Sequence, residues 1–435
     1  MGKSKFLTAA AAVFSLAAVS FGTAAPAEAV TTITIASFGE VIKTAKADPK
    51  GLVAQYEKLH PNIKIQISIS SMDEVSNSLT TKCLSRKTPD IVAIEISWSG
   101  RWRQKSSCLT DLRTMSPSAS TLESKYLGWR WDQGVAFDGK VIGIPTDVGG
   151  YAVAYRTDLF KAAGLPTDRA KVSALWPTWD KFIATGKAFK LKTKKAFIDN
   201  SGNMFAAILN QGNQKFYNNS GGFVYATNPQ VKTAFNTATK AMTTSFPAST
   251  KLKADIGARI APFTTDWIAG INKGAFAVTL APAWMMDYIK KDAPKTKGKW
   301  DIATIPGGTG NLGGTQLAIP AFAPNKVEAW KFLSWYTAPA QQLQVFKKYG
   351  IFPAASSLYT NVALKGYKDP FFNNAPVGSI YIKSVAAVQP IVEGEKQRII
   401  DQIFGQALSR VARGAQTPAA AWSQSMTDIR KSVGG

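Results

Sequence analysis

Alternating polar and apolar residues predict the first elements of the chain. The alternation covers residues 32–36 (TITIA) and is most regular over 63–69 (IKIQISI), as is typical of strands with one buried face. Residues 91–94 (IVAI) form an uninterrupted apolar run, which indicates a strand buried on both faces. Helical stretches at 50–59 and 72–84 separate the three strands. This order of strands and helices predicts a parallel sheet with helical crossovers.

Later segments continue the mixture of strands and helices, so the predicted fold class is α/β. The connection 146–150 (TDVGG) between two of these strands is rich in turn-forming residues. We expect strands at 141–145, 151–155, 275–280, 302–305 and 316–320, and helices at 178–189, 231–243, 326–337, 339–349 and 394–413.

Residues 1–29 have the pattern of a secretory signal peptide. Lys3 and Lys5 precede the apolar run 6–21, and residues 27–29 (AEA) offer a small-x-small cleavage site. The run is shorter than the roughly 20 residues of a membrane anchor. We therefore expect a secreted protein in the periplasmic or cell-envelope space. No lipid anchor is expected, because no cysteine lies near the cleavage site.

Histidine and cysteine are scarce in this chain of 435 residues. There is one histidine, His60, and there are two cysteines, Cys83 and Cys108. These counts argue against a Ser-His-Asp relay, a His-rich zinc site and a Cys/His nucleophile pair, so we expect no metal and no cofactor. Because export permits disulfides and the cysteine count is even, we predict a Cys83–Cys108 bond; the alternative is two buried free thiols.

The charge balance is strongly basic. Lys and Arg number 52 against 28 Asp and Glu, which gives a net charge of +24, or +23 without residues 1–29. The clusters at 192–195 (KTKK) and 290–299 fall in predicted loops or helix ends, where we expect solvated surfaces. No nucleic-acid-binding module is present, so no nucleic-acid partner is expected. The charge would instead attract the protein to an anionic envelope surface, or it is simply adaptive.

Two sequence features could indicate nucleotide binding or catalysis, and each has to be weighed against its neighbouring residues. Residues 308–313 (GTGNLG) fit the G-x-G-x-x-G string of dinucleotide folds, but no helix opens there, so we interpret the segment as a flexible crossover. Glu40, Glu95 and Asp147 follow or adjoin strand ends. Since glycoside hydrolysis needs only two carboxylates, a secreted glycosidase stays an alternative.

Aromatic residues are the feature of the composition that favours a particular function, the binding of a sugar. They make up 11% of the chain, and Trp98, Trp267 and Trp284 adjoin predicted strand ends or turns. An indole offers a large rigid face and one N–H donor, which suits the C–H faces and hydroxyl edges of a sugar. Core packing is the alternative for any one tryptophan. We expect it for Trp300, Trp330, Trp335 and Trp422.

Three segments together resemble a known family. Residues 138–147 (DGKVIGIPTD), 155–166 (YRTDLFKAAGLP) and 177–180 (PTWD) are similar to the signature of extracellular solute-binding proteins of family 1, within the trehalose/maltose-binding-like branch. The resemblance implies a periplasmic-binding-protein-like fold, in which two α/β lobes joined by crossover hinges close on a sugar. It also implies an ABC-importer permease as the membrane partner.

The resemblance also implies the site residues. Glu40, Glu95 and Asp147 match ligand-contacting acids, Trp284 matches a stacking aromatic, and Gly313 and Gly314 match backbone-exposing glycines of a late crossover. With Trp98 and Trp267, these form the predicted ligand site. Two departures bear on the identity of the sugar: Glu95 replaces the usual aspartate, and the segment 350–354 (GIFPA) lacks the arginine that relatives often carry after its proline.

The expected function is therefore sugar binding without catalysis, by a monomer with no catalytic residue. The predicted lobes are 30–145 with 306–338, and 146–305 with 339–435. A receptor for an anionic ligand, such as a phosphorylated sugar, is the rival within binding. The net charge favours that rival, and Arg101 and Arg103 are the basic residues near a predicted strand-end loop.

Overall fold

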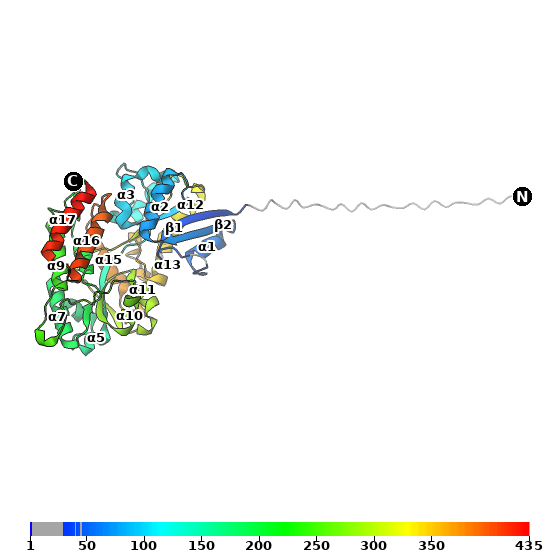
Figure 1. The fold of residues 1–435 in the computed structure, drawn as a ribbon. Helices are drawn as coiled ribbons and strands as arrows, with labels where there is room; N and C mark the ends of the chain where they lie inside the picture. Colours follow the sequence, from blue (N-terminus) through cyan, green and yellow to red (C-terminus); the bar gives the residue numbers. More distant parts are fainter. Residues whose placement is uncertain (2–28, 40, 44–45, 435) are drawn as a thin grey trace.

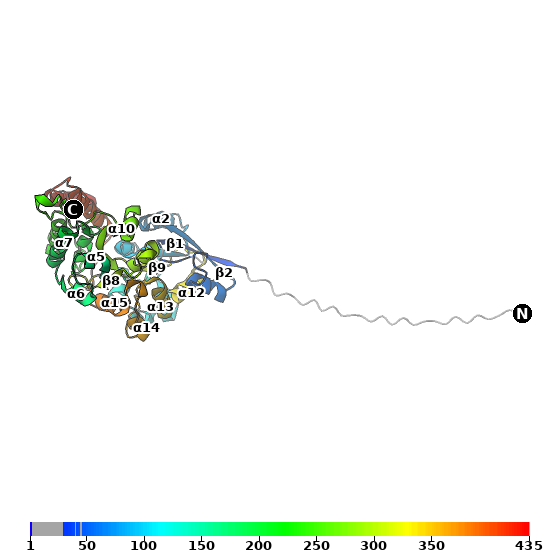
Figure 2. The ribbon, with the colours of Figure 1, turned by 90° about the horizontal axis from the view of Figure 1, so that it is seen from below.

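Two α/β lobes lie side by side in the computed structural model, which describes residues 1, 29–39, 41–43 and 46–434. The segment predicted to be a signal peptide lies outside the described residues except for its two ends. Figures 1 and 2 show β1 (Thr31–Phe38), β2 (Ile63–Ser70) and α12 (Lys326–Tyr336) in one lobe, and α5 (Thr157–Ala162) and α7 (Trp179–Thr193) in the other. The α/β architecture predicted from the sequence is confirmed.

The sheet of the first lobe has the order β2-β1-β3-β9-β4. β1 is parallel to β2, with Ile35 opposite Ile67, and it is also parallel to β3. β9 returns late in the chain and runs antiparallel to both β3 and β4. The parallel arrangement predicted for the first three strands is therefore confirmed. Their bounds are β1 Thr31–Phe38, β2 Ile63–Ser70, β3 Ile91–Glu95, β4 Ile144–Pro145 and β9 Thr315–Ala318.

The sheet of the second lobe has the order β6-β7-β5-β8. β7 is parallel to β6 and antiparallel to β5, and β5 is antiparallel to β8. Consequently β5 ends at the sheet edge where the other three strands begin. The bounds are β5 Tyr151–Arg156, β6 Ala196–Ile198, β7 Phe276–Pro282 and β8 Trp300–Ala303.

Local sequence explains where several helices begin and end. Ser71 and Glu74 form a capping box at the start of α2, and Thr178 and Thr264 cap α7 and α10. Gly274 ends α10 in the left-handed conformation. The helices of the first lobe are α1 Leu52–Leu59, α2 Met72–Leu84, α3 Ser99–Gln104, α4 Gly128–Asp132 and α12 Lys326–Tyr336, and α13 Pro339–Tyr349 lies at the junction with the second lobe.

The other helices surround the second sheet. The predicted helix at 178–189 continues to Thr193, and that at 394–413 is trimmed at both ends. Their bounds are α5 Thr157–Ala162, α6 Arg169–Ala174, α7 Trp179–Thr193, α8 Asn203–Leu209, α9 Pro229–Met242, α10 Thr265–Lys273, α11 Met285–Asp292, α14 Val362–Lys365, α15 Val377–Ala386, α16 Gln397–Ala412 and α17 Pro418–Val433.

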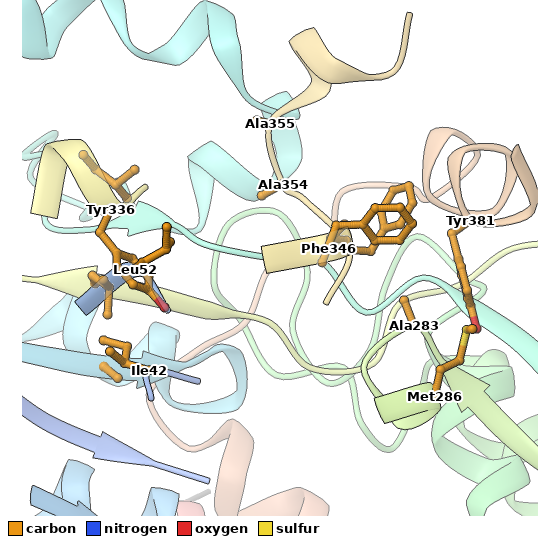
Figure 3. Packing of buried hydrophobic residues seen from close by; sticks show 14 of the residues in the cluster. Ile42, Leu52, Ala283, Met286, Tyr336, Phe346, Ala354, Ala355 and Tyr381 are labelled. Carbon is orange, nitrogen blue, oxygen red and sulfur yellow. The ribbon is translucent and has the colours of Figure 1, made fainter. Parts of the chain in front are cut away.

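One buried apolar cluster continues from the first lobe into the second. Figure 3 shows Leu52 and Tyr336 on the first-lobe side, Phe346 between the lobes, and Met286 and Tyr381 on the second-lobe side. A second cluster fills the space between the second sheet and helices α7, α8, α9, α16 and α17. Phe346 of α13 packs against residues of both lobes, so the lobes are joined at this helix by buried apolar side chains.

A smaller cluster behind β3 holds the disulfide. Cys83, at the end of α2, is bonded to Cys108, with 5.7 Å between their Cα atoms. That separation is within the usual range for a disulfide. The predicted Cys83–Cys108 bond is confirmed.

Three crossing segments lie against one another where the lobes join. The connection from β4 to β5 meets that from β8 to β9: the amide of Gly149 donates to Oδ1 of Asn311, and the amide of Leu312 donates to the Gly149 oxygen, both at 2.8 Å. The amide of Val148 donates to the oxygen of Phe352 in a third segment. A Cβ on Gly149 would lie 1.7 Å from the Leu312 oxygen, so only glycine fits.

Candidate functional site

Two adjoining cavities lie between the lobes, at the ends of strands from both sheets. The aromatic cavity, about 380 Å³, is lined by Trp284 after β7 and by Asp147 after β4. The charged cavity, about 300 Å³, extends toward α16. Glu95, Leu312 and Gly313 line both cavities, so they form the boundary between them. Strand ends at the junction of α/β sheets are where such folds place their ligands.

Three rings from the second lobe form one wall of the aromatic cavity. Trp284 lies at the turn between β7 and α11, and Tyr288 follows one helical turn later. Phe263 packs against both, with ring centroids 6.0 Å from Trp284 and 4.8 Å from Tyr288. The indole N–H of Trp284 donates to the main-chain oxygen of Leu312 at 2.8 Å. The ring is thus held in one orientation.

Phe263 is a residue that sequence reasoning missed. It lies in the loop before α10, has a φ of +69°, and exposes 48% of its surface. A bulky side chain in the left-handed region is uncommon and is often found at functional sites. No hydrophobic periodicity in this loop indicates Phe263 as a site residue. Tyr288 could have been predicted as one, because it lies four residues after Trp284 and therefore on the same face of a helix.

Glu95 ends β3 and points into the boundary between the cavities. Its Oε2 accepts hydrogen bonds from the amide and the hydroxyl of Ser97. Its Oε1 lies 3.8 Å from the position that a Cβ would take on Gly313. Burial, together with the nearby carboxylate of Glu393, raises the pKa of Glu95 to about 7 despite the Ser97 bonds. Near neutral pH the protonated form of this carboxyl group could also donate a hydrogen bond to a ligand.

Asp147 is the second acid of the aromatic cavity. Its Oδ1 accepts from the hydroxyl of Thr146 at 2.7 Å and from the amide of Thr315 at 2.8 Å. The fully buried guanidinium of Arg130 donates to the main-chain oxygens of Asp147 and Thr315. Burial raises the pKa of Asp147, and Arg130 opposes that rise. Both bonds are accepted by Oδ1, and together they fix the orientation of the carboxylate.

Gly313 and Gly314 bring the late crossover close to these side chains. Both have positive φ, +75° and +131°. A Cβ on Gly313 would lie 3.3 Å from Nε1 of Trp284, and one on Gly314 would lie 3.0 Å from a nitrogen of Arg130. Positive φ and close contact together favour glycine at both positions. The crossover exposes backbone to the aromatic cavity here.

The charged cavity combines amide side chains with ion pairs. Nζ of Lys215 lies 2.8 Å from Oε1 of Glu393. Burial raises the pKa of Asp401 to about 6, although Lys215 opposes the rise. Burial lowers the pKa of Lys215, but Glu393 and Asp401 outweigh this and raise it overall. The amide side chains that line this cavity are Gln133, Asn203, Asn210, Asn311 and Gln389. Among the described residues, no cluster of His, Cys, Asp and Glu could hold a metal ion.

Arg398 of the charged cavity also joins the lobes. From α16 it donates to both carboxylate oxygens of Asp73 on α2, at 3.0 and 3.1 Å. Burial raises the pKa of Asp73, but the bonds from Arg398 outweigh this and lower it. The hydroxyl of Ser99 adds a longer bond to Glu393 at 3.4 Å. These contacts close one end of the cleft.

The structure does not bring every predicted residue to the cavities. Trp98 is buried beside β3 and donates its indole N–H to Asp73 at 3.0 Å. Trp267 is fully buried in α10 and donates to Asp199 at 3.0 Å. Neither lines a cavity, because a helix directs each ring into a lobe core. Glu40 lies outside the described residues.

Basic residues do not converge on the aromatic cavity. Among the described residues its lining holds three acids and no lysine or arginine. Arg101 donates to Asn77 and lies over the ring of Trp98, and Arg103 donates to the Val135 oxygen. Neither arginine lines either cavity. The geometry therefore favours a neutral ligand rich in hydroxyl groups over an anion.

In residues 29–39, 41–43 and 46–434, no helix has the length and apolar character that a membrane crossing requires.

Curated proteins named for the sugars that they bind are similar to much of this chain. Among curated proteins, the lactose-binding protein of Rhizobium radiobacter is 28% identical over 306 residues, or 66% of each chain. The arabinooligosaccharide-binding protein of Bacillus subtilis (strain 168) is 22% identical over 356 residues, or 78% of each chain.

Solved structures share the fold over nearly the whole chain. A crystal structure of an extracellular solute-binding protein of family 1 is 35% identical, with a TM-score of 0.78, and the match covers 92% of this chain and 99% of that one. The galacto-N-biose/lacto-N-biose I-binding protein of the ABC transporter from Bifidobacterium longum is 18% identical, with a TM-score of 0.72 over 94% and 98% of the two chains. The sequence model of the family of bacterial extracellular solute-binding proteins matches residues 42–343, and this chain belongs to that family.

Proposed function

We propose that this protein binds an oligosaccharide between its lobes and delivers it to the permease of an ABC importer. One observation carries the proposal: the rings of Phe263, Trp284 and Tyr288 line the same cavity as the acids Glu95 and Asp147. Sugars present apolar C–H faces to rings and hydroxyl edges to carboxylates. The names of the relatives, which refer to lactose and arabinooligosaccharides, support this ligand class.

In this proposal, the two lobes make different kinds of contact with the sugar. Trp284 stacks on one sugar ring from the second lobe, while Glu95 of the first lobe and Asp147 of the β4–β5 crossover accept hydrogen bonds from hydroxyl groups. The amide side chains of the charged cavity, such as Asn203 and Asn311, provide both donors and acceptors for further hydroxyls. A family of binding proteins needs no catalytic residue, and none is assigned.

The cavities also bear on ligand length. Each is near the lower end of the volume range of small-molecule sites, and they adjoin at Glu95 and Gly313. An oligosaccharide passing this boundary would contact the aromatic cavity with one ring and the charged cavity with the next. A disaccharide or longer chain therefore fits better than a monosaccharide.

The lobe boundaries belong to the same proposal. Residues 30–145 with 306–338, and 146–305 with 339–435, would move as two bodies about the crossovers in a monomer. The pairing of Gly149 with Asn311 and Leu312 supports a shared hinge. Small-angle scattering should give a smaller radius of gyration with bound sugar than without it.

A thermal-shift screen tests the ligand class directly. Lactose, maltose and arabinooligosaccharides are compared with glucose 6-phosphate. A matching neutral sugar at 100 times its Kd should stabilise the protein by roughly 2.7 kcal/mol. No shift with any neutral oligosaccharide and a clear shift with the phosphorylated sugar would overturn the proposal. Release of reducing ends from the bound sugar would instead indicate a glycosidase.

A further inference from the structure

The second sheet has a basic edge opposite the cleft. Trp284 follows β7 into the cleft, so the start of β7 lies at the far edge. The antiparallel and parallel pairings bring the starts of β6 and β8 and the end of β5 to the same edge. Lysines lie beside each of these strand ends. They are Lys161 in α5 after β5, Lys192, Lys194 and Lys195 before β6, Lys273 before β7, and Lys297 and Lys299 before β8.

Contacts between these segments show that the lysines share one surface. Nζ of Lys192 lies 2.7 Å from the position of a Cβ on Gly164, which follows α5. Nζ of Lys195 donates to the Gly274 oxygen at 3.2 Å, directly before β7. The amide at the start of α5, from Thr157, donates to the Lys299 oxygen at 2.9 Å. Figure 1 shows α5 and α7 at the end of the molecule away from α2 and α3.

The charge of this surface, here called the basic pole, is poorly compensated. All seven lysines are exposed, and within the described part of the chain none of them forms an ion pair. Three acids lie nearby. Asp158 is paired with Arg156 at 2.7 Å, and Asp301, at the start of β8, is paired with Arg169 at 3.0 Å. Asp292 lies near Lys273, since its main-chain oxygen accepts from the side chain of Asn272. A net positive field therefore extends from this end of the molecule.

We propose that the basic pole docks the protein onto an anionic phospholipid surface. Seven long, solvated ammonium groups from four separate segments match an extended layer of negative headgroups better than a single phosphate. An extracellular protein that must reach a membrane permease also gains local concentration from such contact. Because the pole lies at the sheet edge opposite the cleft, docking leaves both cavities accessible. The proposal does not depend on which solute the cleft binds.

Co-sedimentation with vesicles tests the docking. Vesicles of phosphatidylcholine alone are compared with vesicles that also contain phosphatidylglycerol, at low and high salt. The pole variant is Lys161→Glu, Lys192→Glu, Lys273→Glu and Lys299→Glu, none of whose side chains makes a hydrogen bond among the described residues. Wild type should bind only the anionic vesicles, more weakly in high salt, and the pole variant should bind at least about 30-fold more weakly.

A matched variant separates the pole from net charge. Lys58, Lys82, Lys87 and Lys331 are exposed on helices α1, α2 and α12 of the first lobe or beside them, and reversing all four changes the net charge equally. This control should keep nearly all of the vesicle binding. Equal loss in both variants would overturn the proposal, as would absence of wild-type binding to anionic vesicles. Binding of soluble polyphosphate without vesicle binding would also overturn it, in favour of an anionic polymer.

Discussion

The indole of Trp284 and the main-chain oxygen of Leu312 are joined by a hydrogen bond of 2.8 Å across the junction of the lobes. This bond connects the aromatic wall of the second lobe to the crossover that leads back to the first. It also fixes the ring of Trp284 before any ligand arrives. A preorganised ring loses little freedom on binding, so more of its contact energy contributes to affinity.

Replacing Trp284 with alanine should weaken oligosaccharide binding at least about 30-fold, because about 2 kcal/mol of ring contact is lost. The unliganded protein should lose only about 1 kcal/mol, the worth of the bond to Leu312. Trp284→Phe keeps a ring and removes the donor, so it should recover most of the affinity. Calorimetric titration and urea unfolding of each variant provide the two measurements.

Trp267 is the matched control for that experiment. Its ring lies beneath Phe263, with 5.8 Å between centroids, and it is fully buried. Trp267→Ala should cost about 3–5 kcal/mol of stability, and the fraction that stays folded should keep most of its affinity. If instead Trp284→Ala lost stability and kept its affinity, Trp284 would be a core residue and the site assignment would be wrong.

The contrast between Trp284 and Trp267 shows which parts of the site could be predicted from the sequence. Strand ends were predictable from the period-two and apolar runs, and they brought Glu95, Asp147 and Trp284 to one cavity. Trp98 and Trp267 also adjoin strands or turns, but short helices begin at those points and rotate the rings inward. Rotation about a helix axis depends on tertiary packing, which local pattern does not contain.

The missed parts of the site have a similar cause. Phe263 is contributed by an irregular loop whose conformation is set by contacts with Trp284 and Tyr288. The charged cavity depends on α16, which meets first-lobe residues that lie far earlier in the chain: Asp73 and Arg398 are 325 residues apart. Pairings over such distances in sequence are determined by topology rather than by spacing. The family resemblance indicated Glu95 and Asp147, which line the aromatic cavity, but it did not indicate these neighbours.

The raised pKa of Glu95 predicts a pH-dependent stability. With a pKa of about 7 in the folded state and about 4.5 unfolded, the folded state holds the proton more tightly. The free energy of unfolding should therefore fall as pH rises from about 4.5 to about 7, by at most about 3 kcal/mol from this group. Glu95→Gln removes this contribution. Urea unfolding across that pH range should show the wild type losing stability relative to the variant; parallel curves would contradict the assignment.

The ion pair between Asp73 and Arg398 should favour the closed arrangement of the lobes. Asp73→Asn keeps an oxygen for the indole N–H of Trp98 but removes the charge that holds Arg398. Asp73 lines neither cavity, so weaker sugar binding by about threefold to tenfold would reflect the lost bridge. Calorimetric titration measures the change.

A second bridge between the lobes provides the control for Asp73. Lys105 and Glu395 lie 3.2 Å apart and are more exposed than the Asp73–Arg398 pair. An exposed single pair contributes little, so Glu395→Gln should change the affinity less than about twofold. Equal effects from both substitutions would mean that general electrostatics, not the bidentate bridge, governs closure.

Breaking the disulfide should lower stability without altering the site. Cys83 and Cys108 close a loop with a sequence separation of 25, which corresponds to about 3.5 kcal/mol in the chain-entropy description. Neither cysteine lines a cavity. The double variant with both cysteines replaced by alanine should therefore unfold at lower urea concentration and keep its sugar affinity. Two free thiols in the non-reduced wild type, measured by mass spectrometry, would show that the bond does not form.

Gly100 offers a test of lobe closure that touches no ligand. It lies in α3 of the first lobe, and a Cβ there would be 2.4 Å from the main-chain oxygens of both Glu393 and Gly394, which precede α16 of the second lobe. Both obstacles are backbone atoms, so neither can move aside by changing a rotamer. Gly100→Ala must therefore hold the 393–394 segment away from α3 by a fraction of an ångström or more.

The expected result of Gly100→Ala is an opened cleft. Sugar affinity should fall about tenfold, and the radius of gyration at saturation should exceed that of the liganded wild type. Gly128→Ala is the matched control, because a Cβ on Gly128 meets nothing within 4 Å and helix α4 tolerates alanine. That variant should bind like wild type. If Gly100→Ala also bound like wild type with an unchanged radius, contact between α3 and the 393–394 segment would not be part of the ligand-bound state.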